Sequence, residues 1–285
     1  MTNKALIQRH FNRASAHYDR YAYIQREVGT RLLEHLDVMN IAPKKILDLG
    51  TSTGMIASQL QSRYPEATVV GIDLADAMLQ QAQRLHAQKN LLFITADAES
   101  LPFSAQQFDC VISNLTLQWC DVARVFAEVQ RILKVNGLWL FSTLGPDSLF
   151  EIRQSWQGID TAAHTLAFTD LHDLGDAIVT AKFADPVMEM EKITFQYSSI
   201  ETMLADIRGI GAQNVHPQQP QGFMGKQRWQ AFTEHFQALF CRDNLYPLSY
   251  EIVYGHAWKP ERDPTVSSDE TGVARFPLAY LRRQG

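Results

Sequence analysis

The pattern of apolar and polar positions from residue 45 onward predicts alternating strands and helices. Short runs rich in β-branched residues are separated by longer stretches in which apolar residues recur at helical spacing. The predicted strands are 45–49, 68–73, 91–95, 108–113 and 137–143, and the predicted helices between them are 54–63, 75–87 and 121–134. Strands joined by helices of this length form right-handed βαβ units, so the pattern predicts a parallel sheet covered on both faces. Asn136 and Gly137 are expected to end the last of these helices.

The chain on either side of this alternating part is mainly helical by the same criterion. Residues 4–38 have helical spacing, and their polar side is rich in arginine, namely Arg9, Arg13, Arg20, Arg26 and Arg31. Beyond the fifth strand, helices are predicted at 147–157 and 170–182 and strands at 188–197 and 249–259. Helices at 200–208 and 225–240, joined by the polar stretch 213–221, fill the connection between those two strands. A connection of this length is expected to have a structure or a function of its own.

These elements divide the chain into four regions. We expect a helical cap in residues 1–40, an α/β core in 41–197 and 248–259, and a helical lid in 198–247. Residues 260–285 are rich in charge, proline and serine, and we expect them to form a flexible tail until a partner binds them.

Composition and charge narrow the class of protein. With 46% hydrophobic and 20% charged residues, the chain is expected to be soluble and globular. A net charge of −5 gives no overall attraction to nucleic acids or acidic membranes, and neither a membrane-length apolar run nor a signal-peptide core is present. Three widely spaced cysteines favour buried thiols in a reducing compartment, so the cytoplasm is the expected location. Neither the cysteines nor the nine histidines have metal-ligand spacing, and no metal is expected.

The loop after the first strand indicates a nucleotide-like cofactor. Glycines at 50 and 54 allow the backbone to approach a ligand closely, and the helix that follows offers unpaired amides. A dinucleotide fingerprint placed on Gly50 would require glycine where the chain has Ser52 and Met55. The dinucleotide interpretation therefore fails at two positions.

Polar side chains follow several of the predicted strands at their carboxyl ends, where open α/β sheets bind ligands. Asp73 ends the second strand, 23 positions after Gly50, and its carboxylate can accept both hydroxyls of a ribose. Asp97 follows the third strand and Asn114 the fourth. Each acid alone could be a capping or surface residue, but together they favour a cofactor site at this edge.

The spacing Asp48-x-Gly50-x-x-x-Gly54 resembles the first motif of class I S-adenosylmethionine-dependent methyltransferases, which usually have a third glycine where this chain has Ser52. The resemblance continues in the segments 74–78, 95–103 and 108–114. It implies a Rossmann-like, seven-stranded, mostly parallel sheet with helices on both faces, closed by an antiparallel hairpin that places the lid at the cofactor edge. The residues implied to bind S-adenosyl-L-methionine are Asp48, Gly50, Ser52, Gly54, Asp73, Leu74, Asp97, Ala98 and Asn114.

A narrower resemblance is to the malonyl-acyl-carrier-protein O-methyltransferases of biotin synthesis. It rests on the segments 11–19 with Gln25, 113–120, Leu144 with Leu149, the spacing of His164 and Phe168, and 207–214. It implies methylation of the free carboxylate of a malonyl thioester on acyl carrier protein or coenzyme A. The ester would mask the charge, so that fatty-acid elongation accepts the group as an apolar primer.

Methyl transfer to a carboxylate requires no strong base, but it requires a cation or hydrogen-bond donors that orient one oxygen. Family members tend to have an arginine some eight residues beyond Gly211-Ala212, where this chain has Gln219. The residues expected to bind the acceptor are therefore Arg208, Lys226, Arg228, Gln118 and Trp119, with Tyr18 as the catalytic hydroxyl. Each cation could equally be a surface charge, and Tyr18 a core tyrosine.

Other functions remain open from the sequence. The same fold could methylate another small carboxylic acid or a quinone-type ring. A third possibility is an assembly-factor relative that does not methylate, which Ser52 and the missing arginine could indicate. The arginine-rich helices are either a solvated face or a landing site for an acidic partner such as a carrier protein.

Overall fold

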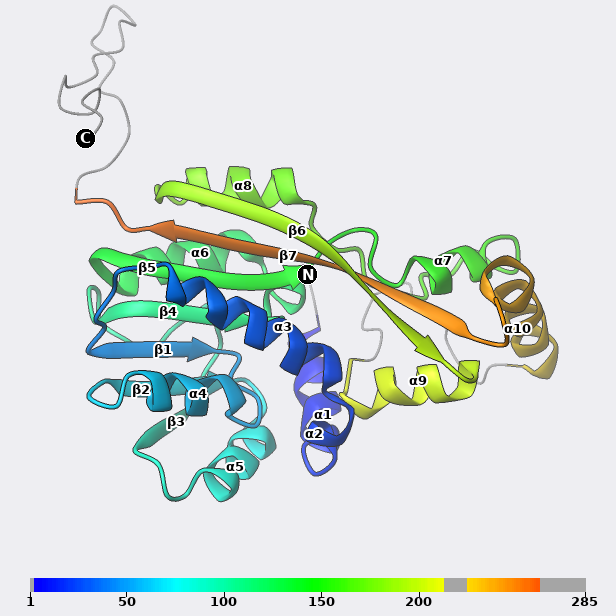
Figure 1. The fold of residues 1–285 in the computed structure, drawn as a ribbon, viewed down its shortest axis with the longest axis horizontal. Coiled ribbons are helices and arrows are strands. Elements are labelled where there is room, and N and C mark those ends of the chain that lie inside the picture. The colour runs from blue at the N-terminus through cyan, green and yellow to red at the C-terminus, as the bar shows by residue number, and fades with distance from the viewer. Residues whose placement is uncertain (1–2, 213–224, 262–285) are drawn as a thin grey trace, which may run out of the picture.

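The computed structural model describes residues 3–212 and 225–261, and these form one seven-stranded sheet with helices on both faces (Figure 1). The strands are β1 (Lys45–Leu49), β2 (Thr68–Asp73), β3 (Leu91–Thr95), β4 (Phe108–Asn114), β5 (Leu133–Leu144), β6 (Ala184–Tyr197) and β7 (Tyr246–Trp258). Their order is β3-β2-β1-β4-β5-β7-β6, and only β7 runs antiparallel to its neighbours. This confirms the class I methyltransferase topology, including the final hairpin whose first strand is parallel to the others.

Ten α-helices are found in the described residues. They are α1 (Lys4–Ala14), α2 (Tyr18–Tyr21), α3 (Tyr23–Glu34), α4 (Met55–Arg63), α5 (Asp76–Leu85), α6 (Val122–Ile132), α7 (Phe150–Trp156), α8 (Leu171–Thr180), α9 (Ile200–Gly209) and α10 (Lys226–Phe240). Two short 3₁₀ helices cover His35–Asp37 and Leu117–Trp119.

Successive apolar residues of β1 face different cores, as expected for a buried parallel strand. Ile46 packs in a cluster with side chains of α3 and α4, whereas Leu47 packs in a second cluster with side chains of α6 and α8. Both residues are fully buried. The near-continuous apolar runs in the sequence therefore reflect a sheet that is covered by helices on both faces.

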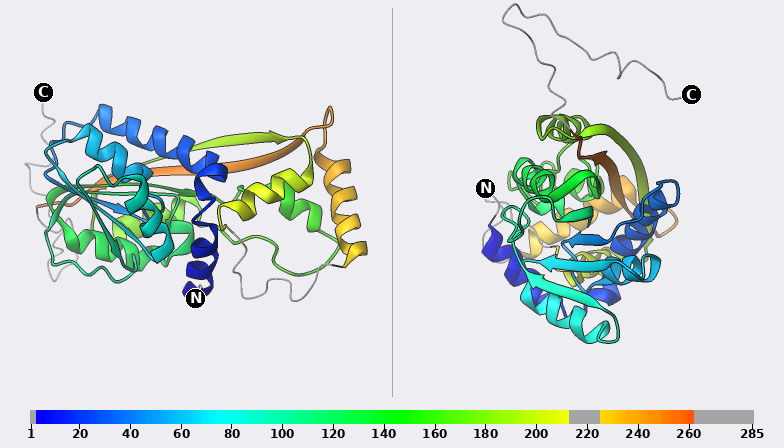
Figure 2. Two further views of the ribbon diagram at one scale, coloured as in Figure 1. Left: turned by 90° about the horizontal axis from the view of Figure 1, so that it is seen from below. Right: turned by 90° about the vertical axis from the view of Figure 1, so that its left-hand side faces the viewer.

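The β6–β7 ribbon extends well beyond the rest of the sheet. Pairing of β7 with β5 ends at Leu144 and Ile252, but pairing with β6 continues to Tyr197 and Tyr246. Helices α7, α9 and α10 lie around this extension, at the carboxyl ends of the parallel strands (Figures 1 and 2). The insertion between β6 and β7 therefore starts at the edge where the cofactor motifs end.

The prediction that Asn136 and Gly137 end a helix was wrong. Helix α6 ends at Ile132, and the next residue, Leu133, already pairs with Phe108 of β4. Asn136 adopts a left-handed φ of 60° inside β5, and its N–H donates to the carbonyl of Lys259. Backbone groups of this segment find partners on β4 and at Lys259, just after β7, and this pairing replaces the last helical turn.

Two other helical regions are more divided or shorter than their sequence pattern indicates. Residues 4–38 form three separate α-helices, interrupted after Ala14 and at Ala22. Helix α7 begins at Phe150, because the backbone N–H of Asp147 and the hydroxyl of Ser148 donate to Glu251, at 2.7 and 3.0 Å. These contacts hold the start of the segment on β7.

The structure tests the predictions about the cysteines and the polar segments only in part. The three cysteines are free thiols, but only Cys110 is buried, while Cys120 and Cys241 are half-buried. The whole polar stretch 213–221, including Gln219, and nearly all of the tail 260–285 lie outside the described residues. Within the described part of the chain, each helix is too short or too polar to cross a membrane.

Candidate active site

The loop between β1 and α4 is held in shape by Asp48. This carboxylate is buried, and it accepts hydrogen bonds from the hydroxyl of Thr51 at 2.6 Å and from the N–H of Ala57 at 3.0 Å. Burial raises the pKa of Asp48 to about 7, against the opposing effect of these donors. Asp48 therefore stabilises the conformation of this loop from its buried side.

The loop requires glycine at residue 50. Gly50 has a φ of 78°, and a Cβ built there would lie 2.1 Å from the hydroxyl oxygen of Thr116. Ser52, the departure from the family's third glycine, also adopts a positive φ, at 52°. Glycine adopts this conformation without steric cost, which explains why the family usually has glycine at this position. This chain has a serine there, in a strained backbone conformation.

Asp73 joins this loop to the end of β2. Its two carboxylate oxygens accept the backbone N–H groups of Ser52 at 2.9 Å and Ala75 at 2.8 Å. Burial raises the pKa of Asp73 to about 6, although the backbone donors act in the opposite direction. The carboxylate lies at the wall of a cavity, where it can accept hydroxyl groups of a ligand.

This first cavity, of about 90 Å³, collects most of the predicted cofactor residues. Those that line it are Gly50, Ser52, Asp73, Leu74, Asp97, Ala98 and Asn114. Asp48 and Gly54 lie outside the lining and shape the loop. Strand-end acids with a glycine-rich turn are the donor and acceptor set that an adenosyl ligand needs, so these residues fit S-adenosylmethionine.

Helix α1 forms the opposite wall of this cavity, which the sequence reasoning missed. Lys4 pairs with Asp97 at 2.5 Å and with Glu99 at 2.8 Å, and Gln8 donates to the carbonyl of Leu74 at 2.9 Å. Asn12 donates to the carboxylate of Asp76 and accepts the N–H of Ala77, at 2.8 and 3.0 Å. The segment 11–19 had been assigned by resemblance alone, and no local pattern indicated these contacts.

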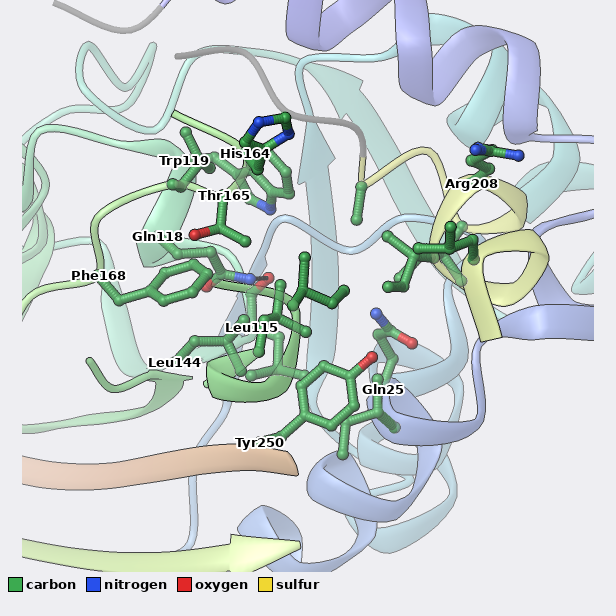
Figure 3. A pocket seen from close by; sticks show the side chains of 18 of the residues that line it. Gln25, Leu115, Gln118, Trp119, Leu144, His164, Thr165, Phe168, Arg208 and Tyr250 are labelled. Carbon is green, nitrogen blue, oxygen red and sulfur yellow. Dashed lines mark hydrogen bonds between the residues drawn. The ribbon is translucent and has the colours of Figure 1, made fainter. Parts of the chain in front are cut away.

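A second cavity, of about 380 Å³, adjoins the first (Figure 3). The residues that line both cavities are Phe11, Tyr18, Leu115 and Trp119. The larger cavity is mainly apolar and is enclosed by α3, the 144–168 segment, α9, α10 and β7. Leu144, Leu149, His164 and Phe168, which contribute to the resemblance, all line it.

Tyr18 lies at the junction of the two cavities. Its side chain is buried, and its hydroxyl forms a hydrogen bond with the side chain of Ser52. Burial raises the pKa of Tyr18 far above the physiological range, so the hydroxyl stays protonated. The position is suitable for contact with both ligands.

The structure separates the three predicted cations. Arg208 lines the larger cavity from α9, whereas Lys226 is exposed at the start of α10 and Arg228 contacts Asp160. Asp160 is partly buried, which raises its pKa, but hydrogen bonds from Arg228 and His164 outweigh this and hold it at about 2. Of these three cations, Arg208 alone lies at the cavity, and the charge of Arg228 is used to fix the 157–170 loop.

Gln118 and Trp119 both line the larger cavity. Gln118 donates to the carbonyl of Leu115 at 2.6 Å and accepts from Thr143 at 3.3 Å, so its amide holds the wall. Trp119 packs edge-to-face on Phe11, with ring centroids 5.4 Å apart. Among residues 3–212 and 225–261, three or more His, Cys, Asp or Glu side chains nowhere gather in a way that could hold a metal ion.

Comparison with known proteins agrees with this geometry. Residues 47–141 match a family described as a methyltransferase domain. The crystal structure of the YcgJ protein from Bacillus subtilis shares the fold with a TM-score of 0.59 at 18% identity, covering 82% of this chain and 99% of that one. A putative methyltransferase from Bacillus halodurans gives the same TM-score and identity, covering 81% and 99%. The fold and the site define a class I S-adenosylmethionine-dependent methyltransferase.

Relatives that match nearly the whole chain show which family it belongs to. Proteins named malonyl-[acyl-carrier protein] O-methyltransferase from Gallionella capsiferriformans and Laribacter hongkongensis are both 42% identical, covering 96% and 94% of each chain respectively. The protein of that name from Legionella pneumophila is 36% identical over 96% of this chain and 97% of its own. The chain belongs to the malonyl-[acyl-carrier protein] O-methyltransferase family.

Proposed function

We propose that this protein methylates the free carboxylate of a malonyl thioester carried by an acyl carrier protein. The observation that carries the proposal is the pair of adjoining cavities, one lined by an adenosyl-binding set and one mainly apolar. When bound, S-adenosylmethionine would supply a sulfonium methyl group. A carboxylate oxygen of the acceptor would bond to this methyl carbon in line with the breaking C–S bond, S-adenosylhomocysteine would leave, and no proton transfer is needed. The acceptor charge and the sulfonium charge cancel in this step, and an apolar cavity favours that cancellation.

The residues of the chain bind, orient and exclude water in this proposal. Asp73 accepts the ribose hydroxyls, while Asp97 and Ala98 contact the adenine. Phe11 and Trp119 close the junction against water. Tyr18 presents its hydroxyl at the junction, where it orients the reacting carboxylate.

The outer elements serve as a lid and a docking face. Helices α9 and α10 of the predicted lid, together with the N-terminal helices, close over the core and enclose the acceptor. Arg9, Arg13 and Arg20 are exposed on α1 and α2 and give an acidic carrier protein a basic surface. Methylation would mask the malonyl charge and so prepare the primer of biotin synthesis.

The test is a mass measurement on the acceptor. Purified protein is incubated with S-adenosylmethionine and malonyl acyl carrier protein, and we expect a gain of one methyl group. Malonyl coenzyme A and free malonate serve as comparison acceptors, and both are expected to react more slowly. Absence of the gain with folded, cofactor-binding protein would defeat the substrate assignment.

A further inference from the structure

Several polar side chains that line the larger cavity form no hydrogen bond with a described residue. Two of them, Gln25 from α3 and Tyr250 from β7, point into the same part of the cavity, beside Leu115 (Figure 3). Buried polar groups in native proteins are nearly always paired, so unpaired ones that face a cavity indicate a ligand.

The backbone of Gln25 is fixed beside the cofactor edge. Asn114, at the end of β4, donates to the carbonyl of Gln25 at 2.9 Å, and Ser142 of β5 donates to the oxygen of Asn114 at 2.8 Å. The side-chain oxygen of Gln25, in contrast, is buried without a partner. The nitrogen of the same amide points into the cavity in Figure 3, where it can donate to a ligand.

Tyr250 supplies a second neutral donor. Its side chain is 7% exposed, and no hydrogen bond from its hydroxyl to a described residue is among the influences on its pKa. Burial raises the pKa of Tyr250, and the nearby hydroxyl of Tyr197 and carboxylates of Asp206 and Glu151 act in the same direction. The hydroxyl therefore remains a donor throughout the working pH range.

Three other polar residues of the wall, Gln118, His164 and Arg208, are less suitable as donors to a carboxylate. The amide of Gln118 is bonded at both ends, and Nε2 of His164 contacts Asp160 at 2.9 Å. Arg208 is exposed and stands apart from Gln25 and Tyr250 in Figure 3.

We propose that the amide of Gln25 and the hydroxyl of Tyr250 hold the acceptor carboxylate for methyl transfer, while Arg208 acts at the edge of the cavity. A guanidinium bound to both carboxylate oxygens would lower their nucleophilicity, whereas two neutral donors orient the group and leave its charge available. This inference rests on the proposed carboxyl methylation and names the residues that select a carboxylate.

The test compares Gln25→Leu and Tyr250→Phe with matched controls. We expect kcat/KM for malonyl carrier protein to fall about 10- to 100-fold in each variant, because a buried donor to a charged group is lost. Cofactor affinity, measured by calorimetry, should stay within about twofold of the parent, since neither residue lines the cofactor cavity.

Two controls separate this role from packing. Gln61→Leu removes another glutamine with a buried, unpaired oxygen, and Tyr254→Phe removes a hydroxyl on the same strand that bonds to Glu191. Both should retain the parent kcat/KM. Gln25→Glu adds a readout that packing would not move: at saturating cofactor its activity should rise as pH falls, because the protonated acid regains a donor.

Direct binding distinguishes the possible failures. Malonate is titrated into the protein saturated with S-adenosylhomocysteine, and we expect Gln25→Leu and Tyr250→Phe to weaken binding by the same factor as kcat/KM. Normal turnover and binding in these variants would overturn the inference and leave the proposed function intact. If the parent binds malonate through both residues but does not methylate the carrier substrate, the proposed function fails alone. Absence of carboxylate binding in the parent overturns the carboxylate-holding role directly.

Discussion

The two cavities of this methyltransferase are built in opposite ways. The cofactor cavity is small and is shaped by backbone hydrogen bonds to Asp48 and Asp73. The larger cavity, where we propose that the acceptor binds, is about four times larger in volume and is assembled from helices, a loop and a hairpin that are distant in sequence. We therefore expect recognition of S-adenosylmethionine to depend on backbone geometry at strand ends, and recognition of the proposed acceptor to depend on side chains.

The largest effect should come from Asp73→Asn, which alters the wall of the cofactor cavity. The variant loses a charged acceptor for the ribose and an acceptor for the N–H of Ser52, so we expect cofactor affinity to fall about 100-fold. Calorimetry with S-adenosylhomocysteine measures this, and Asp176→Asn, an exposed position on α8, is the control. Unchanged affinity would mean that this acid does not contact the ligand.

Tyr18→Phe tests the junction, where the two kinds of recognition meet. We expect kcat to fall about twentyfold, because the variant removes the hydroxyl next to the reacting groups, while cofactor affinity changes less. Steady-state kinetics with saturating malonyl carrier protein gives kcat, and Tyr64→Phe serves as the matched variant. A loss confined to cofactor affinity would place Tyr18 on the cofactor side alone.

The pH dependence of cofactor affinity tests the cofactor cavity without a mutation. The pKa of Asp73 is about 6, and only its ionised form accepts two hydroxyl groups, so cofactor affinity should be constant above pH 6. Below that pH it should fall about tenfold per pH unit, because the protonated fraction must ionise before binding. Calorimetry between pH 5 and 7.5 measures the step, with circular dichroism to show retention of the fold. Asp73→Asn should lack the step, and its persistence there would point to a different group.

The smallest effect is expected at the edge of the larger cavity. Arg208→Gln should raise the KM for malonyl carrier protein about fourfold with little change in kcat, because an exposed cation attracts the acceptor but does not hold it during transfer. Raised salt should diminish the difference. Lys226→Gln, at a position outside the lining of the larger cavity, should have the KM of the parent. Equal increases of KM in both variants would mean that Arg208 has no special role at the cavity.

The contrast between the cavities also explains what could be predicted from the sequence. The cofactor residues follow strand ends at short, regular intervals, so a pattern along the chain is enough to bring Gly50, Asp73 and Asn114 together. Arg228 was a reasonable candidate for the acceptor, but its partner Asp160 lies 68 positions away and no local pattern joins them. Gln25 and Tyr250 are separated by most of the chain and meet only through the fold.

The errors in secondary structure have a similar origin. The helix expected to end at Asn136 stops earlier because its final residues pair with β4 and with Lys259, contacts that lie outside any sequence window. The N-terminal helix is divided because α1 packs on α5 while α3 packs on the sheet. Tertiary contacts overrode a correct helical periodicity in both places.

Helix α1 is a shared wall, and this has a thermodynamic consequence. Lys4 and Gln8 hold it on the cofactor side, while Phe11 closes both cavities. Any displacement of α1 therefore changes both binding sites together. Occupation of either cavity stabilises the same helix position, so each ligand should raise the affinity for the other by the same factor, and the two sites form one cooperative unit.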